Sequence, residues 1–235
     1  MANSYFQFKQ FTICHDRCAM KVGTDGVLLG AWAASDKAPT RILDVGTGSG
    51  LIAIMLAQRF EHSTVRGIDI DSDSVKQARE NAERSPFGCR ITIEESDFSK
   101  VTYQDEKYSL IISNPPFYEE ETLGGDARRD SARHTCSLPF QTLIANATKM
   151  LDDEGVFAVI IPTAAANNFV AECAFNNLYL HRRLDIKTTP RKVAKRTMLE
   201  FGKRMHETEK AELCMRDSNN NLSTEYVRLT EDFYL

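Results

Sequence analysis

The stretch Arg41-Ile-Leu-Asp-Val-Gly-Thr-Gly-Ser-Gly50 runs directly into the apolar run Leu51-Ile-Ala-Ile-Met-Leu-Ala57. Its first half favours a buried strand, its three alternating glycines favour a tight turn, and the apolar run favours a helix. Gly46, Gly48 and Gly50 would bring backbone amides close to a ligand at a helix N-terminus, where unpaired N–H groups face outward. This order predicts the first unit of an α/β fold.

An acidic residue stands two places before the first glycine. The spacing G-x-G-x-G also differs from the dinucleotide fingerprint G-x-G-x-x-G, and the carboxylate of Asp44 would repel a pyrophosphate. It suits a ligand that carries an amine and a sulfonium. We therefore expect Asp44, Gly46, Gly48 and Gly50 to bind S-adenosylmethionine, and a nicotinamide oxidoreductase is the alternative that the spacing disfavours.

The composition, 235 residues with 42% apolar and 26% charged side chains, predicts a single domain with an ample core. We expect an N-terminal cap or lid over residues 1–40, a core over 41–205 and a C-terminal extension over 206–235. The sequence has neither a signal-peptide core nor an apolar run of membrane-spanning length, which predicts a cytoplasmic protein without a membrane partner. We expect a monomer. Six cysteines without a C-x-x-C pair give no reason to expect a metal site.

Strand and helix patterns alternate after the glycine turn, which is typical of a parallel sheet with helices on both faces. The patterns predict seven strands, of which the last is antiparallel. Expected strands cover residues 42–45, 64–70, 89–94, 110–112, 155–162, 179–188 and 198–203, and expected helices follow the glycine turn and cover 73–84, 137–150 and 165–178.

Acidic residues follow the second and third predicted strands. Asp69 lies about twenty residues past the last glycine, where a carboxylate can accept hydrogen bonds from both hydroxyls of a ribose, and Ile70 is assigned to the same site. Asp97 is placed to accept from the amine of an adenine while Phe98 covers the ring. The alternative is that Asp97 only forms a turn.

Asn114-Pro115-Pro116-Phe117 ends the strand expected over residues 110–112. Prolines cannot donate ladder hydrogen bonds, so the strand stops there, next to the first strand and at the edge where open α/β sheets bind ligands. The oxygen atoms of Asn114 and Pro115 could accept both hydrogens of a purine amine and so localise its lone pair. Phe117 can stack on the base, and the prolines hold the group rigid. We therefore predict that these four residues are catalytic.

A short helix is expected before the core, with Thr24 or Asp25 as its N-cap. One interpretation is a lid that offers Lys21, Thr24 and the helix N-terminus to the carboxylate of the cofactor. The alternative is a helix that only packs on the sheet.

The whole chain resembles the tRNA1(Val) adenine-N6 methyltransferase family, within the class I S-adenosylmethionine-dependent methyltransferases. The resemblance is carried by the glycine turn, Asn-Pro-Pro-Phe, His-Asp-Arg-Cys-Ala-Met-Lys-Val-Gly-Thr-Asp-Gly over residues 15–26 and the ending Asp-Phe-Tyr-Leu. It implies a Rossmann-like methyltransferase sheet and methylation of the adenine beside the anticodon. Adenine-specific members commonly have Tyr in place of Phe117, and Asn-Pro-Pro-Phe also marks guanine-N2 methyltransferases that act on ribosomal RNA.

Two charged segments are candidates for RNA contact in a chain whose net charge is −4. Residues 118–136 form either a lid whose arginines face phosphates or a solvated loop. Residues 182–196 hold seven basic side chains against one acid, which favours a phosphate-contact patch. The RNA-binding candidates are Arg128, Arg129, Arg133, Arg191, Lys192, Lys195 and Arg196.

Three alternatives to adenine methylation stay open at this point. They are guanine-N2 methylation of ribosomal RNA, methylation of a glutamine amide in a protein, and RNA binding without turnover. The basic segment disfavours the protein substrate, and the presence of Asp44, Asp69 and Asn114 disfavours the loss of turnover.

Overall fold

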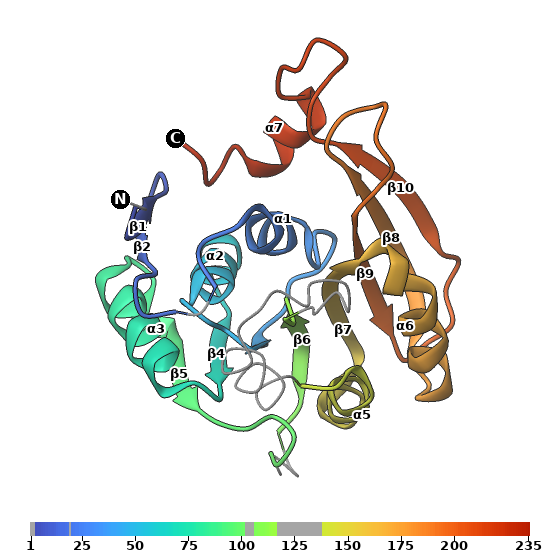
Figure 1. Ribbon diagram of the computed structural model, residues 1–235. Coiled ribbons are helices and arrows are strands. Elements are labelled where there is room, and N and C mark those ends of the chain that lie inside the picture. The colour runs from blue at the N-terminus through green and yellow to red at the C-terminus, as the bar shows by residue number, and fades with distance from the viewer. Residues whose placement is uncertain (1–2, 19, 102–105, 117–137) are drawn as a thin grey trace, which may run out of the picture.

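A computed structural model of the chain describes residues 3–18, 20–101, 106–116 and 138–235 (Figure 1). The strands are β1 Tyr5–Gln7, β2 Thr12–Cys14, β3 Arg41–Val45, β4 Thr64–Asp69, β5 Ile91–Glu95, β6 Tyr108–Ser113, β7 Leu151–Pro162, β8 Tyr179–Lys187, β9 Arg196–Gly202 and β10 Glu209–Cys214. The helices are α1 Thr24–Trp32, α2 Leu51–Arg59, α3 Ser72–Arg84, the 3-10 helix η1 Gly88–Arg90, α5 Phe140–Met150, α6 Thr163–Phe175 and α7 Thr224–Thr230.

The central sheet has the strand order β10-β8-β9-β7-β6-β3-β4-β5. Its strands are parallel except β9, which is antiparallel to both β7 and β8. The chain leaves β3 towards β4 and β5 on one side and returns to β6 on the other side. The carboxyl ends of β3 and β6 therefore form the topological switch point of the sheet. The doubly wound, mostly parallel class is confirmed.

The sheet has one strand more than the sequence predicted, because β10 extends it beyond β8. Only Leu213 of this strand is fully buried, and its first four residues are exposed. The hydrophobic alternation that marks a strand is therefore absent from Glu-Lys-Ala-Glu. Backbone pairing with β8 holds the strand in place, together with an ion pair of 2.7 Å between Lys187 and Glu212.

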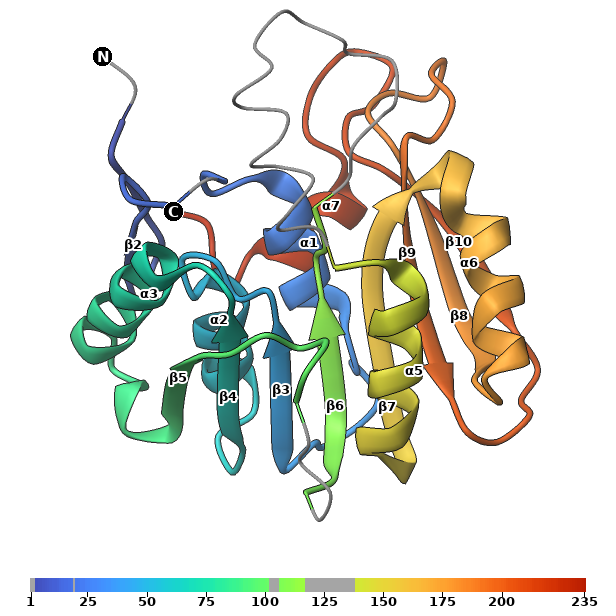
Figure 2. The same cartoon turned by 60° about the horizontal axis from the view of Figure 1, so that its bottom comes forward.

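Helices cover both faces of the sheet (Figure 2). On one face α1, α2, α3 and α7 pack on alternate strand residues such as Ile42, Leu110 and Ile160. On the other face α5 and α6 pack on their neighbours in sequence, such as Leu43 and Ile111. The central strands are thus buried on both sides, as parallel strands require.

The two ends of the chain meet beside α1 and α2 (Figure 1). The β1–β2 hairpin contributes Phe8 and Phe11 to a cluster with Phe233, and the amide of Lys9 donates to the carbonyl of Phe233 at 2.8 Å. Ser223 is the N-cap of α7, and its hydroxyl oxygen accepts from the amide of Tyr226. Among the helices that the structure describes, none combines the length and apolar character needed to cross a membrane.

Candidate active site

The glycine turn between β3 and α2 adopts the predicted conformation. Gly46, Gly48 and Gly50 have φ angles of 72°, 54° and 79°, which side-chain-bearing residues rarely adopt. A Cβ atom at Gly46 or Gly48 would meet nothing within 4 Å, so these two positions leave their ligand side open. A Cβ at Gly50 would lie 3.2 Å from the Cβ of Ala78, so Gly50 allows α3 to pack closely on the turn.

Asp69 ends β4 and links this strand to the glycine turn. One carboxylate oxygen accepts from the amide of Gly48 at 2.8 Å and the other from the amide of Asp71 at 3.0 Å. Burial raises the pKa of Asp69, and the two amides oppose this shift. Asp69 and Ile70 both line the cavity described below, so the carboxylate is rigidly oriented at its wall.

Asp44 lies beneath the glycine turn and not along a cavity wall. Its side chain is fully buried, and one oxygen accepts from the hydroxyl of Thr47 at 2.6 Å. Burial raises the pKa of Asp44 to about 7, while Thr47 and the amide of Ala53 favour the charged form. Asp44 thus supports the glycine turn from below. The predicted contact between Asp44 and a ligand stays a prediction.

Asp97 and Phe98 follow β5 and line the same cavity as Asp69. One oxygen of Asp97 accepts from the amide and hydroxyl of Ser99, and the other pairs with Lys100 at 2.9 Å. The Ser99 hydroxyl and Lys100 lower the pKa of Asp97 to about 2. Asp97 therefore forms a turn and also faces the cavity. Phe98 is buried, and the side-chain amide of Asn146 donates a hydrogen bond to its carbonyl oxygen.

Asn114 follows β6 at the switch point. The preceding residue, Ser113, donates to the carbonyl of Val45 at 2.8 Å and so fixes the end of β6 to the end of β3. Within the described residues no hydrogen bond engages the Asn114 side chain, whose nitrogen lies 4.0 Å from the position of a Cβ at Gly26. The amide of Asn114 is thus available to a ligand. Phe117 lies outside the described residues.

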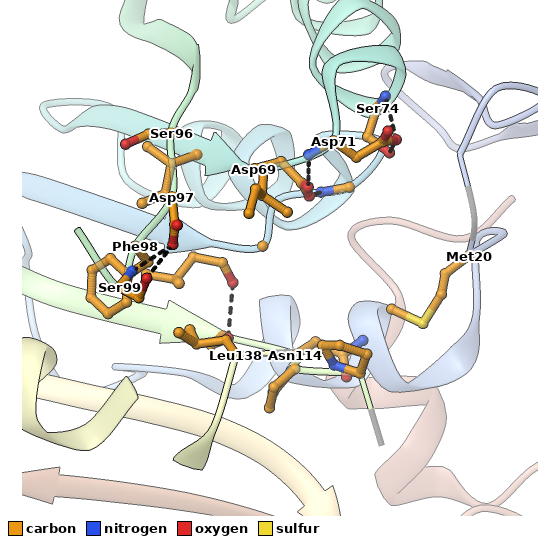
Figure 3. A pocket seen from close by; sticks show the side chains of 18 of the residues that line it. Met20, Asp69, Asp71, Ser74, Ser96, Asp97, Phe98, Ser99, Asn114 and Leu138 are labelled. Atoms are coloured by element: carbon orange, nitrogen blue, oxygen red, sulfur yellow. Dashed lines mark hydrogen bonds between the residues drawn. The ribbon is translucent and has the colours of Figure 1, made fainter. Parts of the chain in front are cut away.

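Two cavities meet at Asn114. The first, of about 310 Å³, is surrounded by the residues after β4, β5 and β6 (Figure 3). The second, of about 390 Å³, lies between the glycine turn and the start of α1. The residues common to both are Met20, Gly46, Gly48, Asn114 and Pro115. Pro116 lines only the first cavity.

The second cavity contains the predicted cap residues. Lys21 and Thr24 line it. The N-cap of α1 is Gly23 and not Thr24 or Asp25, so the predicted N-cap is wrong, and no side chain caps the helix. The amides of the first turn are therefore available to an anionic group in this cavity. Arg196 also lines this cavity and donates to Asp25 of α1 at 2.8 Å.

The predicted basic segment divides into paired and unpaired side chains. In the strands, Arg182 pairs with Glu200, Arg183 with Asp185, and Lys187 with Glu212. Arg191, Lys192 and Lys195 lie on the exposed loop between β8 and β9, where none forms an ion pair with a described carboxylate. The other RNA-binding candidates, Arg128, Arg129 and Arg133, lie outside the described residues.

Some cavity residues were not assigned a role from the sequence. Cys18 and Met20 line the first cavity, although they belong to the stretch that carried the family resemblance. Ser96 and Leu138 also line it. Ser96 directly precedes the predicted Asp97, and the fold brings Leu138 to the cavity from a different part of the chain. Among the described residues no cluster of His, Cys, Asp and Glu is arranged to hold a metal.

Comparison with known proteins agrees with this architecture. A family model described as a methyltransferase domain matches residues 36–219. A crystal structure of a predicted O-methyltransferase from Agrobacterium tumefaciens superposes with a TM-score of 0.69 at 20% identity, over 89% of this chain and 96% of that one. The ribosomal protein L11 methylase of Lactobacillus delbrueckii subsp. bulgaricus gives 0.54 at 22% identity, over 77% and 78%. At these identities the two structures support the fold alone.

Two relatives are similar over nearly their whole length. The tRNA1(Val) (adenine(37)-N6)-methyltransferase of Pectobacterium carotovorum is 43% identical over 98% of this chain and 93% of its own. The protein of the same name from Bacteroides fragilis strain ATCC 25285 is 41% identical over 100% and 99%. The chain belongs to the tRNA1(Val) (adenine(37)-N6)-methyltransferase family.

Proposed function

We propose that the protein transfers the methyl group of S-adenosylmethionine to the exocyclic N6 amine of an adenine in tRNA. The relatives named above point to adenine 37 of tRNA1(Val). The observation that carries the proposal is the position of Asn114 and Pro115, which line both cavities at the switch point of the sheet. An amine that binds to these two residues stands where the cavities meet.

The linings of the two cavities fit the two ends of S-adenosylmethionine. The first offers the carboxylate of Asp69 for ribose hydroxyls, with Asp97 and Phe98 for a purine. The second offers Lys21 and the uncapped N-terminus of α1 for a carboxylate. Bound there, the cofactor supplies an electrophilic methyl carbon. Asp44 strengthens the site indirectly, because it holds the glycine turn from below through Thr47.

The proposed reaction requires little acid–base catalysis from the protein. The oxygen atoms of Asn114 and Pro115 accept the two amine hydrogens, and this orients the nitrogen lone pair and reduces its delocalisation into the purine ring. Pro115 and Pro116 keep the acceptors in place before the substrate binds. Phe117 is proposed to stack on the base. A strong base is not needed, since the proton can leave after the nitrogen has been methylated.

The exposed loop between β8 and β9 is the proposed contact for tRNA phosphates. Arg191, Lys192 and Lys195 are exposed there at the carboxyl edge of the sheet, on the same edge as Asn114. Arg196 connects this loop to α1 through Asp25. Arg128, Arg129 and Arg133 stay proposed RNA contacts. We also propose that the protein acts as a monomer in the cytoplasm, where its tRNA substrate is found.

The experiment that tests the proposal is nucleoside analysis of methylated RNA. Unmodified tRNA1(Val) and ribosomal RNA are each incubated with the protein and labelled S-adenosylmethionine, and then digested. Label in N6-methyladenosine from the tRNA is expected. Label only in N2-methylguanosine, or no label in either RNA, would contradict the proposed substrate. Binding of tRNA without any transfer would contradict the proposed reaction.

A further inference from the structure

The C-terminal extension places a second loop beside the basic loop. After β10 the chain follows the end of β8, where the amides of Met215 and Arg216 donate to the carbonyls of Lys187 and Thr188 at 2.8 and 3.1 Å. Residues 188–195 and 216–222 therefore leave the carboxyl edge of the sheet side by side. In both views the orange loop and the red loop project together past β8 and β10 (Figures 1 and 2).

The second loop is held in one conformation by Asp217. Its carboxylate accepts from the amides of Asn219 and Asn221 at 2.8 and 2.9 Å. The hydrogen bond from the backbone amide of Asn221 is the largest of the interactions that lower the pKa of Asp217. Arg216 donates to the carbonyl of Asn220 at 2.7 Å and closes the loop from the other side. The acidic side chain is thus occupied by donors of its own loop.

The outer surface of the loop is formed by polar side chains. Ser218, Asn219 and Asn220 are exposed, and Leu222 is 50% exposed beside them. Asn220 has a φ angle of 67°, a left-handed conformation that asparagine tolerates better than most residues. An ordered loop with several exposed amides differs from a solvated tail, because the cost of ordering it has been met before any partner binds.

The two loops together carry four cations that form no ion pair with a described carboxylate. They are Arg191, Lys192, Lys195 and Arg216. The cations of the neighbouring strand β8 are paired instead, for example Arg182 with Glu200. The two loops thus place three exposed cations of the basic loop and Arg216 at one edge of the sheet, where the only acidic side chain of the two loops is Asp217.

We infer that the loop of residues 216–222 is the second half of the RNA-binding surface, where Arg216 meets a phosphate and Asn219 and Asn220 meet unpaired nucleotides. This inference rests on the proposed function and extends it to a segment of the C-terminal extension. Carboxamides both donate and accept, which suits the edges of exposed bases and the 2′-hydroxyl of ribose. The basic loop next to it supplies attraction to the backbone, which carries no sequence information by itself.

The two contributions can be separated by the salt dependence of binding. Asn219→Ala/Asn220→Gly removes both carboxamides, and glycine keeps the left-handed conformation at position 220. Arg216→Gln removes one charge. Lys37→Gln, in the exposed loop before β3 at the opposite edge of the sheet, is the control. The dissociation constant of an unmodified tRNA1(Val) transcript is measured at several salt concentrations, with cofactor affinity and thermal unfolding as checks on the fold.

The double variant is expected to bind the transcript about tenfold more weakly with an unchanged salt slope. Arg216→Gln is expected to bind more weakly and to lower the slope by about one. Lys37→Gln should match the wild type. If both loop variants bind within about twofold of the wild type while Arg191→Glu/Lys192→Glu does not, the inference is overturned and the proposed function stands. A wild-type protein that fails to bind the transcript would overturn both.

Discussion

Replacement of Asp69 by alanine should weaken cofactor binding by about a hundredfold. Each carboxylate oxygen of Asp69 already accepts one backbone amide, from Gly48 or Asp71, and keeps a lone pair for one more donor. Two ribose hydroxyls would supply those donors. Hydrogen bonds to a charged group contribute about 1.5 kcal/mol each at the low end of their range, which suits a half-buried side chain. Two such bonds correspond to about 3 kcal/mol and to about a hundredfold in affinity.

Titration calorimetry with S-adenosylhomocysteine and its 2′,3′-dideoxy analogue separates this role from support of the glycine turn. Asp69→Ala should bind the parent ligand far more weakly than the wild type and the analogue about equally. Asp69→Asn keeps one acceptor and should lose about tenfold. An equal loss for both ligands would show that Asp69 only holds Gly48 in place. Unchanged affinity for the parent ligand would reject the ribose contact altogether.

Three further predictions concern stability. Glu200→Ala should lower the free energy of unfolding by about 2 kcal/mol in urea denaturation, because Arg182 loses its buried partner but keeps some solvent contact. Gly48→Ala and Gly50→Ala should both lower it by about 1 kcal/mol, because both glycines have positive φ angles. Gly50→Ala should lower it further, because its Cβ would lie 3.2 Å from Ala78 of α3, whereas a Cβ at Gly48 meets nothing within 4 Å. Equal stability losses would contradict this distinction. The raised pKa of Asp44 means that the folded state binds the proton of this carboxyl more tightly than the unfolded state does. The free energy of unfolding should therefore fall as the pH rises from about 4 to about 7, and Asp44→Asn should flatten this slope. A slope that Asp44→Asn leaves unchanged would exclude this residue as its source.

The parts of the fold with strong local signals could be predicted from the sequence. The glycine turn requires φ angles that few other residues adopt, and the Asn-Pro-Pro sequence ends a strand, so both were located correctly. The expected antiparallel strand over residues 198–203 is β9, Arg196–Gly202. The first residues of β7 were missed, because Asp152, Asp153 and Glu154 interrupt the apolar run before Gly155. Strand β10 was missed because its stability comes from pairing with β8, not from its own pattern.

The functional site depends on neighbours that sequence alone cannot supply. The seven basic residues of the segment 182–196 look alike in sequence, but the register across the sheet decides which of them meet a carboxylate. Arg182 faces Glu200 because β8 pairs with β9 in one particular register. The position of Asp44 beneath the turn likewise depends on the fold. The sequence alone does not distinguish an Asp44 carboxylate that is buried under the turn from one that points into the ligand cavity.

The catalytic role of Asn114 is tested most directly by comparing chemistry and cofactor binding in Asn114→Ala. The single-turnover rate constant with tRNA1(Val) and the dissociation constant of S-adenosylhomocysteine are measured on the same preparation. We predict that the rate constant falls by at least about a hundredfold, since an acceptor at the reacting amine is lost, while the dissociation constant stays within about threefold of the wild type. Equal losses in both, or a rate constant near that of the wild type, would contradict the role of Asn114 at the junction of the two cavities.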